Sequence, residues 1–485
     1  MEPKLPAPKE SPVAQDIDWQ DFRDHLATAD KEGHRRWIYA KQPQGRFYRW
    51  RTWLSWLLLT ILFVGPFVRI NGNPLLLVNI IERRFSILGQ IFWPQDIAIF
   101  AVAMLIFLTG IIVFTTAFGR LWCGWTCPQT LLMEMVFRKI EYLIEGDAVA
   151  QRSLAAAPLS VSKVAKKFFK QAVFFALSFL IANTLLSYII GTEQLYAIVT
   201  DDPRLHLTGL AFMVLFTFLF YAIFARFREQ ACTFICPYGR LQSTIVDENS
   251  LVVAYDYKRG EKRAPLSRQQ TIPARQAEGL GDCVSCHACV AVCPTGIDIR
   301  NGTQMECVSC TACIDVCDHV MDKIGRPRGL IRYASLNSIE RGERFQFTAR
   351  MKAYGILLLA LIALFLVLVF TRSNVESILL RAPGVLFQQT GEGKIRNLYT
   401  LKVINKTSRD IPLELKLENI KGNLQLMSGK LVAPKEQLAQ TSVLIDIAPA
   451  DLPGGHTKLK IGVYSGEKHI ETVNTVFVGP RDMVK

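Results

Sequence analysis

The sequence predicts a multi-domain membrane protein with an α-helical transmembrane core of five spans, an inserted α+β domain rich in cysteine, and a C-terminal all-β sandwich. Five long apolar stretches, a cysteine pattern that occurs twice between 283 and 317, and short alternating segments beyond 371 predict these parts in turn. Half of the 485 residues are apolar, yet a fifth are charged. This composition suits a chain divided between bilayer and water better than one globular core.

Five segments are long and apolar enough to cross a hydrocarbon core. They are 53–70, 97–118, 168–190, 207–227 and 354–370. The stretch 74–93 is amphipathic and is interrupted by Glu82, Arg83 and Arg84, so we expect it to lie at the outer interface rather than to span the membrane. The first 45 residues are polar, so we expect no cleavable signal peptide.

Basic residues predict the orientation of the spans. They crowd the approach to the first span and fill the loop between the second and third, at Arg35, Arg36, Lys41, Arg46, Arg49, Arg51, Arg138, Lys139, Arg152, Lys163, Lys166 and Lys167. Because basic loops stay in the cytoplasm, we expect the N-terminus inside and the C-terminus outside. The net charge of +14 is thus assigned to membrane topology, and no nucleic-acid partner is expected.

This topology divides the chain into five regions. They are a cytoplasmic tail at 1–45 with an amphipathic part at 19–25, a four-span core at 46–250, a cytoplasmic domain at 251–352, the fifth span at 353–371 and an outer domain at 372–485. In the outer domain, alternating runs broken by Asn, Gly and Pro predict strands. The runs are 399–404, 413–417, 424–427, 442–447, 458–464 and 471–478. This spacing predicts an all-β sandwich of about 100 residues.

Eight of the twelve cysteines form an internal duplication in the cytoplasmic domain. The spacing CxxCxxCxxxC occurs first at Cys283, Cys286, Cys289 and Cys293, and again at Cys307, Cys310, Cys313 and Cys317. In such runs three closely spaced thiolates hold one [4Fe-4S] cluster, and the fourth cysteine ligates the other cluster. The run therefore predicts a two-cluster ferredoxin domain. The expected ligand sets are Cys283, Cys286, Cys289 and Cys317 for one cluster, and Cys293, Cys307, Cys310 and Cys313 for the second.

Two other interpretations of this run are weaker. Paired CxxC motifs also bind zinc, but the third and fourth cysteines of both copies favour clusters. The residues from Cys283 to His287 read CVSCH, the attachment pattern for c-type haem. They lie within the cluster run and on the expected cytoplasmic side, whereas haem attachment occurs outside. We interpret His287 as a surface residue near a cluster.

The other four cysteines form two CxxxCP motifs at equivalent places, just past the cytoplasmic ends of the second and fourth spans. They are Cys123 and Cys127, and Cys232 and Cys236. Because proline favours the first position of a helix, Cys127 and Cys236 are predicted N-caps of new helices. A helix N-terminus stabilises a thiolate, and we expect Arg120, Arg228 and Arg240 to act in the same direction.

If the two helical hairpins pack side by side, these four thiolates converge at the inner membrane surface. Thiolates favour Cu(I), zinc or an iron-sulfur cluster over hard cations. The alternatives are small buried residues at helix ends, or a disulfide within each pair, which a reducing cytoplasm disfavours. Met133 and Met135 follow the first motif and are candidate thioether ligands, although core packing is the commoner role of methionine.

Together these features resemble the cytochrome c oxidase accessory proteins called CcoG, FixG or RdxA. The resemblance covers nearly the whole chain. It includes both CxxxCP motifs, the ferredoxin run, the segment GRPRGLIRY at 325–333, RAPG at 381–384 and NLYTLKVINKT at 397–407. It implies that the C-terminal sandwich is immunoglobulin-like.

The resemblance further implies a bacterial inner-membrane protein that reduces Cu(II) to Cu(I) for assembly of cbb3-type oxidases. Its cofactors would be two [4Fe-4S] clusters, with copper as substrate or bound ion, and its catalytic and copper-binding residues Cys123, Cys127, Cys232 and Cys236. The implied partners are the oxidase assembly machinery, a copper ATPase or chaperone, an unidentified cytoplasmic electron donor and a second copy of the chain in a homodimer. Two rival interpretations stay open: a quinol-linked electron-relay subunit like NapH or NosR, which the core also resembles, and a non-enzymatic assembly factor with structural metal sites.

Overall fold

The structure is a computed structural model that describes residues 34–480, with short gaps, together with Thr28 and Glu32. The gaps are 71, 80–83, 94–95, 267–271, 385, 392, 408, 428, 430 and 436. The amphipathic segment predicted at 19–25 lies outside the described residues. The chain divides into two compact units, Met1–Val68 with Phe100–Leu364, and Arg69–Ile99 with Phe365–Lys485.

Five described helices are long and apolar enough to cross a membrane, which confirms the predicted number of spans. They are α2 (Arg46–Val64), α3 (Ile97–Phe118), α8 (Val161–Ile190), α10 (Leu207–Tyr221), which continues into the π-helix η4 (Ala222–Phe227), and α17 (Ala349–Phe370). Three of these helices, α2, α8 and α17, begin earlier than the predicted spans because Arg and Lys are good helix formers and extend each helix beyond its apolar part. Most apolar side chains of α3 and α17 are exposed, as expected of helices that face lipid.

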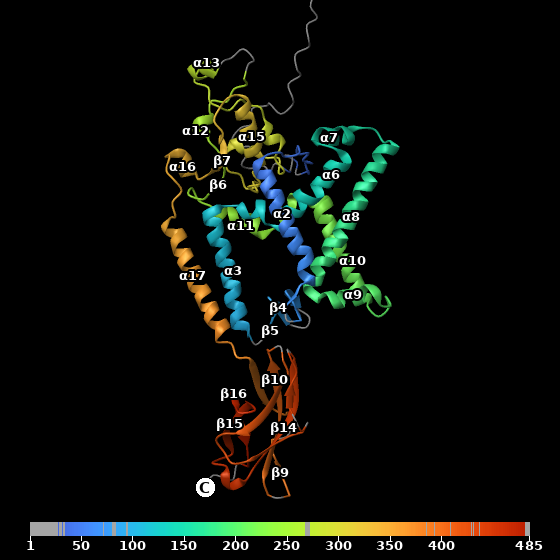
Figure 1. Ribbon diagram of the computed structural model, residues 1–485, viewed down its shortest axis with the longest axis vertical. Helices are drawn as coiled ribbons and strands as arrows, with labels where there is room; N and C mark the ends of the chain where they lie inside the picture. Colours follow the sequence, from blue (N-terminus) through green and yellow to red (C-terminus); the bar gives the residue numbers. More distant parts are fainter. Residues whose placement is uncertain are drawn as a thin grey trace, which may run out of the picture. The chain divides into compact units, whose positions relative to one another are not determined.

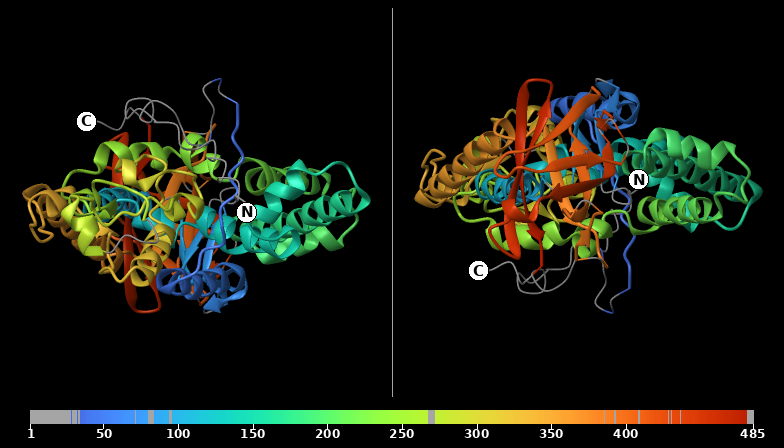
Figure 2. Two further views of the ribbon diagram at one scale, coloured as in Figure 1. Left: turned by 90° about the horizontal axis from the view of Figure 1, so that it is seen from above. Right: turned by 90° about the horizontal axis from the view of Figure 1, so that it is seen from below.

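An aromatic core joins the segment after the first CxxxCP motif to the second helical hairpin. Helices α8 and α10 lie side by side (Figures 1 and 2). The rings of Phe137 and Phe224 stack at 4.5 Å between centroids, and Phe174 meets Phe137 edge-on at 5.0 Å. Phe137 ends the π-helix η3 (Met133–Phe137), which follows the first CxxxCP motif, whereas Phe224 lies in η4, ahead of the second. Burial of the three rings therefore holds the two motif regions together.

Shorter helices follow and connect the spans. They are α4 (Leu121–Trp125), α5 (Pro128–Leu132), α6 (Arg138–Glu145), α7 (Ala148–Ala156), α9 (Thr192–Thr200), the π-helix η5 (Ala231–Ile235) and α11 (Pro237–Ile245). The cysteine-rich domain of the same unit is α+β, as predicted. Its main elements are β6 (Val252–Tyr255), α14 (Ala288–Ala291), α15 (Ala312–Lys323), β7 (Ile331–Ala334) and α16 (Leu336–Glu340). Strands β6 and β7 pair antiparallel, and Val253, Ile331 and Met321 lie in the core beside the cysteines.

The second unit begins with short strands. They are β1 (Arg69–Ile70), β2 (Asn73–Pro74), β3 (Leu76–Asn79), β4 (Arg84–Ile87) and β5 (Gln90–Phe92). The described part of the stretch 74–93 thus forms strands and turns and contains no spanning helix. Asp96 follows β5 and is an anchor of this unit. Its carboxylate accepts hydrogen bonds from Arg372 Nη2 at 2.6 Å and from Lys406 Nζ at 2.7 Å.

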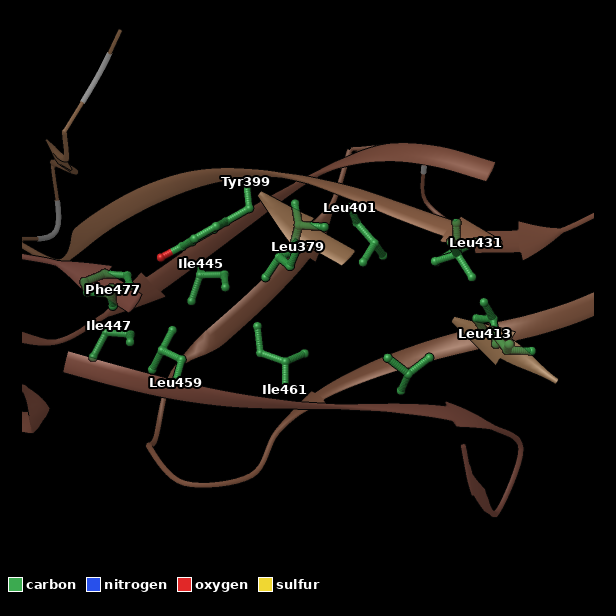
Figure 3. Packing of buried hydrophobic residues seen from close by; sticks show 14 of the residues in the cluster. Leu379, Tyr399, Leu401, Leu413, Leu431, Ile445, Ile447, Leu459, Ile461 and Phe477 are labelled. Carbon is green, nitrogen blue, oxygen red and sulfur yellow. The ribbon is translucent and has the colours of Figure 1, made fainter. Parts of the chain in front are cut away.

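The C-terminal part is the predicted sandwich. One sheet has the order β12-β14-β10-β8, and the other has the order β13-β11-β15-β16. The strands are β8 (Val375–Arg381), β9 (Gln388–Gln389), β10 (Ile395–Asn405), β11 (Ile411–Leu417), β12 (Asn423–Leu426), β13 (Leu431–Ala433), β14 (Leu438–Ile447), β15 (His456–Ser465) and β16 (Lys468–Val478). Figure 3 shows Tyr399 and Leu401 of one sheet facing Leu459 and Ile461 of the other. All six predicted strands are present, whereas β8, β9 and β13 were not predicted because they are short or directly follow the fifth span.

Candidate functional site

The two cysteine runs have the same unusual backbone. Ser285 and His287 in the first copy, and Ser309 and Thr311 in the second, have positive φ angles between 49° and 67°. These residues occupy matching positions, on either side of the second cysteine of each run. Non-glycine residues rarely adopt such angles, and strained backbone of this kind clusters at functional sites. The repeated geometry supports an internal duplication in which both loops wrap around a similar group.

The first predicted ligand set surrounds one small cavity. Its lining includes four thiols, those of Cys283, Cys286, Cys289 and Cys317. Three thiols thus come from the first copy and one from α15 of the second, which is the crossed arrangement predicted from the spacing. Four soft thiolates around one cavity fit a [4Fe-4S] cluster. His287 also lines this cavity and is exposed; its Nδ1 lies 2.9 Å from Arg300 Nη2.

The second predicted ligand set has no exposed cysteine, and all four of its thiols are partly buried. The thiol of Cys293 lies within electrostatic range of Cys307, Cys310 and Cys313. Burial raises the pKa of Cys307 to about 11 and that of Cys310 to about 12. A buried thiol loses its proton when a metal ion binds to the sulfur. These four thiols also fit a [4Fe-4S] cluster, which supplies one-electron transfer when bound.

Both CxxxCP motifs have the predicted local geometry. Cys127 is the N-cap of α5 and Cys236 is the N-cap of α11, and in each case proline occupies the first turn. Cys123 lies in α4 and Cys232 lies in η5. The thiol of Cys232 is within electrostatic range of the other three motif cysteines, so the structure brings all four thiols together.

The stabilisation expected from helix N-termini concerns Cys127 and Cys236, and the first cysteine of each motif differs from them. Burial raises the pKa of Cys123 to about 11 and that of Cys232 to about 12. Arg120 does lower the pKa of Cys123, as predicted, but burial outweighs it. Arg228 instead donates to Glu141 at 2.8 Å and stacks on the ring of Trp37. Without a bound cation, Cys123 and Cys232 therefore stay protonated.

The two candidate methionine ligands point to different places. Met133 lines a small cavity together with Cys232, whereas Met135 accepts a hydrogen bond from Thr52 Oγ1 at 3.9 Å. Across the described residues, no three Cys, His, Asp or Glu side chains are close enough to share one metal ion. The CxxxCP thiols therefore do not form a ready-made tetrahedral zinc site.

The first CxxxCP motif is in direct contact with the loop of the second ligand set. A Cβ atom on Gly124 would lie 2.5 Å from the carbonyl oxygen of Val308 and 2.6 Å from that of Ser309, so only glycine fits. Trp125 Nε1 donates to the hydroxyl of Tyr333 at 3.0 Å, and this hydroxyl donates to the Ser309 carbonyl at 3.2 Å. These contacts place the CxxxCP thiols beside the Cys307–Cys310 loop.

Sequence reasoning missed a buried ion network that links α6, α8 and the residues just before the second motif. Glu141 accepts from Arg228 Nη2 at 2.8 Å and from Lys170 Nζ at 3.2 Å. Despite burial, the Arg228, Lys170 and Arg138 charges lower the pKa of Glu141 to about 2. Glu229, next to Arg228, pairs with Arg35 at 3.2 Å. The signal in the sequence was carboxylates at helix ends among many basic residues, but their pairing depends on packing between distant segments.

Protein families and relatives agree with this architecture. Family models described as "4Fe-4S binding domain", "4Fe-4S dicluster domain" and "IG-like fold at C-terminal of FixG" match residues 100–144, 227–336 and 365–480. RdxA of Cereibacter sphaeroides is 34% identical over 400 residues, which cover 79% of this chain and 83% of RdxA. The chain belongs to the FixG/RdxA family.

Two further relatives show the same family likeness. RdxB of Cereibacter sphaeroides is 33% identical over 385 residues, 76% of this chain and 79% of RdxB. The nitrogen fixation protein FixG of Rhizobium meliloti is 37% identical over 310 residues, 62% of this chain and 58% of that protein. A crystal structure of a FixG-related protein from Vibrio parahaemolyticus is 19% identical, with a TM-score of 0.19, and covers 22% of this chain and 97% of that one.

Membership of this family shows that the chain binds iron-sulfur clusters and transfers electrons. The chain is a membrane protein with iron-sulfur binding domains and an immunoglobulin-like C-terminal region. As a member of the FixG/RdxA family it is an iron-sulfur oxidoreductase involved in electron transfer. The first CxxxCP motif lies inside the match to the 4Fe-4S binding domain, and the second lies inside the match to the dicluster domain. Each motif therefore lies within a match to a family of iron-sulfur binding domains.

Proposed function

We propose that this chain reduces Cu(II) to Cu(I) at the CxxxCP thiols for the assembly of a cbb3-type cytochrome c oxidase. One observation carries the proposal: the four CxxxCP thiols lie together, beside the loop that bears Cys307 and Cys310. No three of these thiols are close enough to share one metal ion, so a copper ion would be held by two of them, next to an electron source. Thiolates stabilise the soft Cu(I) product better than hard cations, which suits a site that makes this product.

The two ligand sets have different exposure, and this difference supports an order of electron flow. All twelve cysteines lie in the described part of the chain, and Cys286 of the first set is the only exposed one. A soluble donor would therefore reach the first set. The contacts of Gly124, Trp125 and Tyr333 hold the second set against the first CxxxCP motif. Electrons would therefore leave the clusters from the second set. When copper binds, Cys123 and Cys232 release their protons to water and form metal–thiolate bonds. One electron from the second set then converts one Cu(II) to one Cu(I).

The remaining family implications belong to the same proposal. The basic residues around the first two spans support a cytoplasmic N-terminus and a periplasmic C-terminal domain in the bacterial inner membrane. The proposed partners are a cytoplasmic electron donor, a copper ATPase or chaperone that takes Cu(I), and the oxidase assembly machinery. A homodimer is a further proposed assembly.

The decisive experiment replaces all four CxxxCP cysteines, Cys123, Cys127, Cys232 and Cys236, by serine. In the purified protein, cluster absorbance and iron content should stay at wild-type values, while reoxidation of the reduced clusters by Cu(II) is lost. The matched control is Ser178→Ala in α8, which changes a buried hydroxyl remote in sequence from every cysteine. Unchanged Cu(II) reduction in the serine variant would overturn the proposal.

An apolar groove favours a second candidate, the quinol-linked electron relay. Helices α2, α6 and α8 and the π-helix η3 line a cavity of about 580 Å³ whose walls include Trp56, Leu59 and Phe63, with Thr52 and Lys139 as polar groups. An isoprenoid quinol combines an apolar tail with a polar ring, as this lining requires. Anaerobic reduction of the clusters by a quinol analogue, at the same rate with and without copper and in the CxxxCP serine variant, would favour this function.

A further inference from the structure

We propose that Arg51, a residue of the first spanning helix, sets the reduction potential of the second cluster site. This site is formed by Cys293, Cys307, Cys310 and Cys313. In this proposal Arg51 does not ligate the cluster but acts on it through the charge of its guanidinium group. It stabilises the reduced form of the site and so makes the second site the better electron acceptor of the two.

The first argument is that Arg51 is a buried charge with no carboxylate partner among the described residues. Its side chain is 2% exposed, and its Nε donates to the carbonyl of Gly124 at 2.6 Å. No described carboxylate forms an ion pair with it, and its Nη2 is buried with no hydrogen-bond partner. Burying an unpaired charge is strongly unfavourable, so an anion is expected next to this group.

The second argument is that the second ligand set supplies that anion. Gly124, which accepts the hydrogen bond of Arg51, packs against the carbonyl oxygens of Val308 and Ser309, so the guanidinium group lies beside the loop that carries Cys307 and Cys310. Four thiolates around a [4Fe-4S] cluster give the site a net negative charge. The arginines near the first set differ, because they already have carboxylate partners: Arg300 pairs with Asp298 at 2.6 Å and Arg259 pairs with Asp282 at 2.5 Å. Their charges are thus largely neutralised, whereas that of Arg51 is not.

The third argument is that the position of Arg51 is fixed from both sides. Asp315 on α15 accepts hydrogen bonds from the backbone of Phe47 at 3.0 Å and Tyr48 at 2.8 Å, in the first turn of α2. Gly45 precedes this turn and lies so close to Asp315 that a Cβ atom would overlap it. The helix that carries Arg51 is therefore docked on the helix that carries Cys313 and Cys317. On the other side, the carbonyl of Gly124 accepts the hydrogen bond from Arg51 and fixes the guanidinium group.

The consequence concerns the direction of electron flow. Reduction adds one electron to the site and requires no proton, so a fixed cation attracts the reduced form more strongly than the oxidised form. Arg51 should raise the potential of the second site and leave the first nearly unchanged. Electrons that enter near Cys286 would then move energetically downhill to the second site. The inference depends on the proposed ligand sets, but not on copper as the substrate.

The test is a redox titration followed by EPR on the full-length protein in detergent, with clusters loaded and copper absent. Arg51→Gln removes the charge but keeps a donor for the Gly124 carbonyl. We expect at least a tenfold shift of one site's equilibrium toward the oxidised form, which for one electron is about 59 mV. Arg49→Gln, an exposed arginine of the same helix, is the matched control and should shift neither site. Cys286→Ser alters the signal of the first site and so identifies the other as the second.

Equal potentials in Arg51→Gln and Arg49→Gln, or equal shifts at both sites, would overturn the proposal. Arg51→Lys keeps a positive charge without the planar fork of nitrogen donors, and its potentials should stay close to wild type. If Arg51→Gln does not retain iron, the potentials of Arg51→Lys are the test of the proposal. A tenfold shift in the lysine variant would show that hydrogen-bond geometry, and not charge, sets the potential.

Discussion

The ferredoxin cysteines and the CxxxCP cysteines both come from duplicated motifs, but different forces hold them in place. In the ferredoxin domain, tight loops with positive φ at Ser285, His287, Ser309 and Thr311 fix each thiol locally. The CxxxCP thiols instead depend on helix ends, the Phe137–Phe224 stack and the ion network of Glu141. The first arrangement can therefore be predicted from spacing alone, whereas the second forms only when distant helices pack.

The largest expected effect tests the crossed ligation of the ferredoxin sets. Cys293→Ala should remove the same EPR signal as Cys310→Ala, although Cys293 lies in the other copy of the motif. Each variant should lose about half of the roughly eight iron atoms per chain. Cys286→Ala should remove the other signal. If Cys293→Ala removed the same signal as Cys286→Ala, each copy would bind its own cluster.

Glu141→Gln should destabilise the packing around the CxxxCP motifs and leave the ferredoxin domain unchanged. Because the lowered pKa of about 2 reflects buried cationic partners, loss of the charge should reduce the free energy of unfolding by about 3 kcal/mol. Thermal unfolding in detergent measures this loss. The exposed Glu193→Gln is the control and should change stability by less than about 0.5 kcal/mol.

The same carboxylate predicts a pH dependence. Because the pKa of Glu141 is lower in the folded protein than the usual value of 4.5, its stabilisation is complete above about pH 4.5. It should be lost as the pH falls from there toward 2, and Glu141→Gln should lack this component of the acid transition. Equal acid midpoints in both proteins would contradict the prediction.

Gly124→Ala tests the contact between the two regions. The added methyl group would overlap the carbonyl oxygens of Val308 and Ser309, so the motif and the loop must separate at a cost of about 1–3 kcal/mol. We expect slower reoxidation of the reduced clusters by Cu(II), with unchanged iron content. Gly110→Ala in α3 is a suitable control because a Cβ atom there meets no neighbouring atom. Equal reoxidation rates in the two alanine variants would argue against this contact as the route.

The smallest expected effect concerns the hydrogen bonds of Tyr333. Tyr333→Phe removes the link between Trp125 and the Ser309 carbonyl, and Trp125→Phe removes only its donor. Each change should cost about 1 kcal/mol of unfolding free energy. In the double variant the costs should be less than additive because both act on one hydrogen-bond chain. Full additivity in thermal unfolding would show that the two residues act independently.

The fold followed from the sequence wherever a pattern was local. The five spans, the N-cap positions of Cys127 and Cys236 and the six predicted strands each depend on neighbouring residues, and all are present. Arg51 shows where such reasoning ends. Its place in the sequence assigns it to the basic residues that set topology, but the structure buries it against Gly124. Its role depends on α2 docking on α15, and no spacing along the chain encodes that contact.

The charged residues near the CxxxCP motifs teach the same lesson. Arg120 and Arg228 both precede a motif cysteine, so the sequence predicted the same role for both. Arg120 does act on Cys123, whereas Arg228 pairs with Glu141, which is distant in sequence. Which neighbour a long side chain reaches is decided by tertiary packing, and one sequence does not show it.

The anchor at Asp96 affects how deletion experiments should be interpreted. Asp96 lies just before α3, yet its two cationic partners, Arg372 and Lys406, belong to the C-terminal part of the chain. Cutting the chain after residue 371 would leave this poorly exposed carboxylate without either partner. A shortened protein would therefore also lose the ion pairs that hold the segment before α3, in addition to losing the sandwich. Charge-neutral pairs such as Asp96→Asn with Lys406→Gln are a cleaner way to find out what the sandwich contributes.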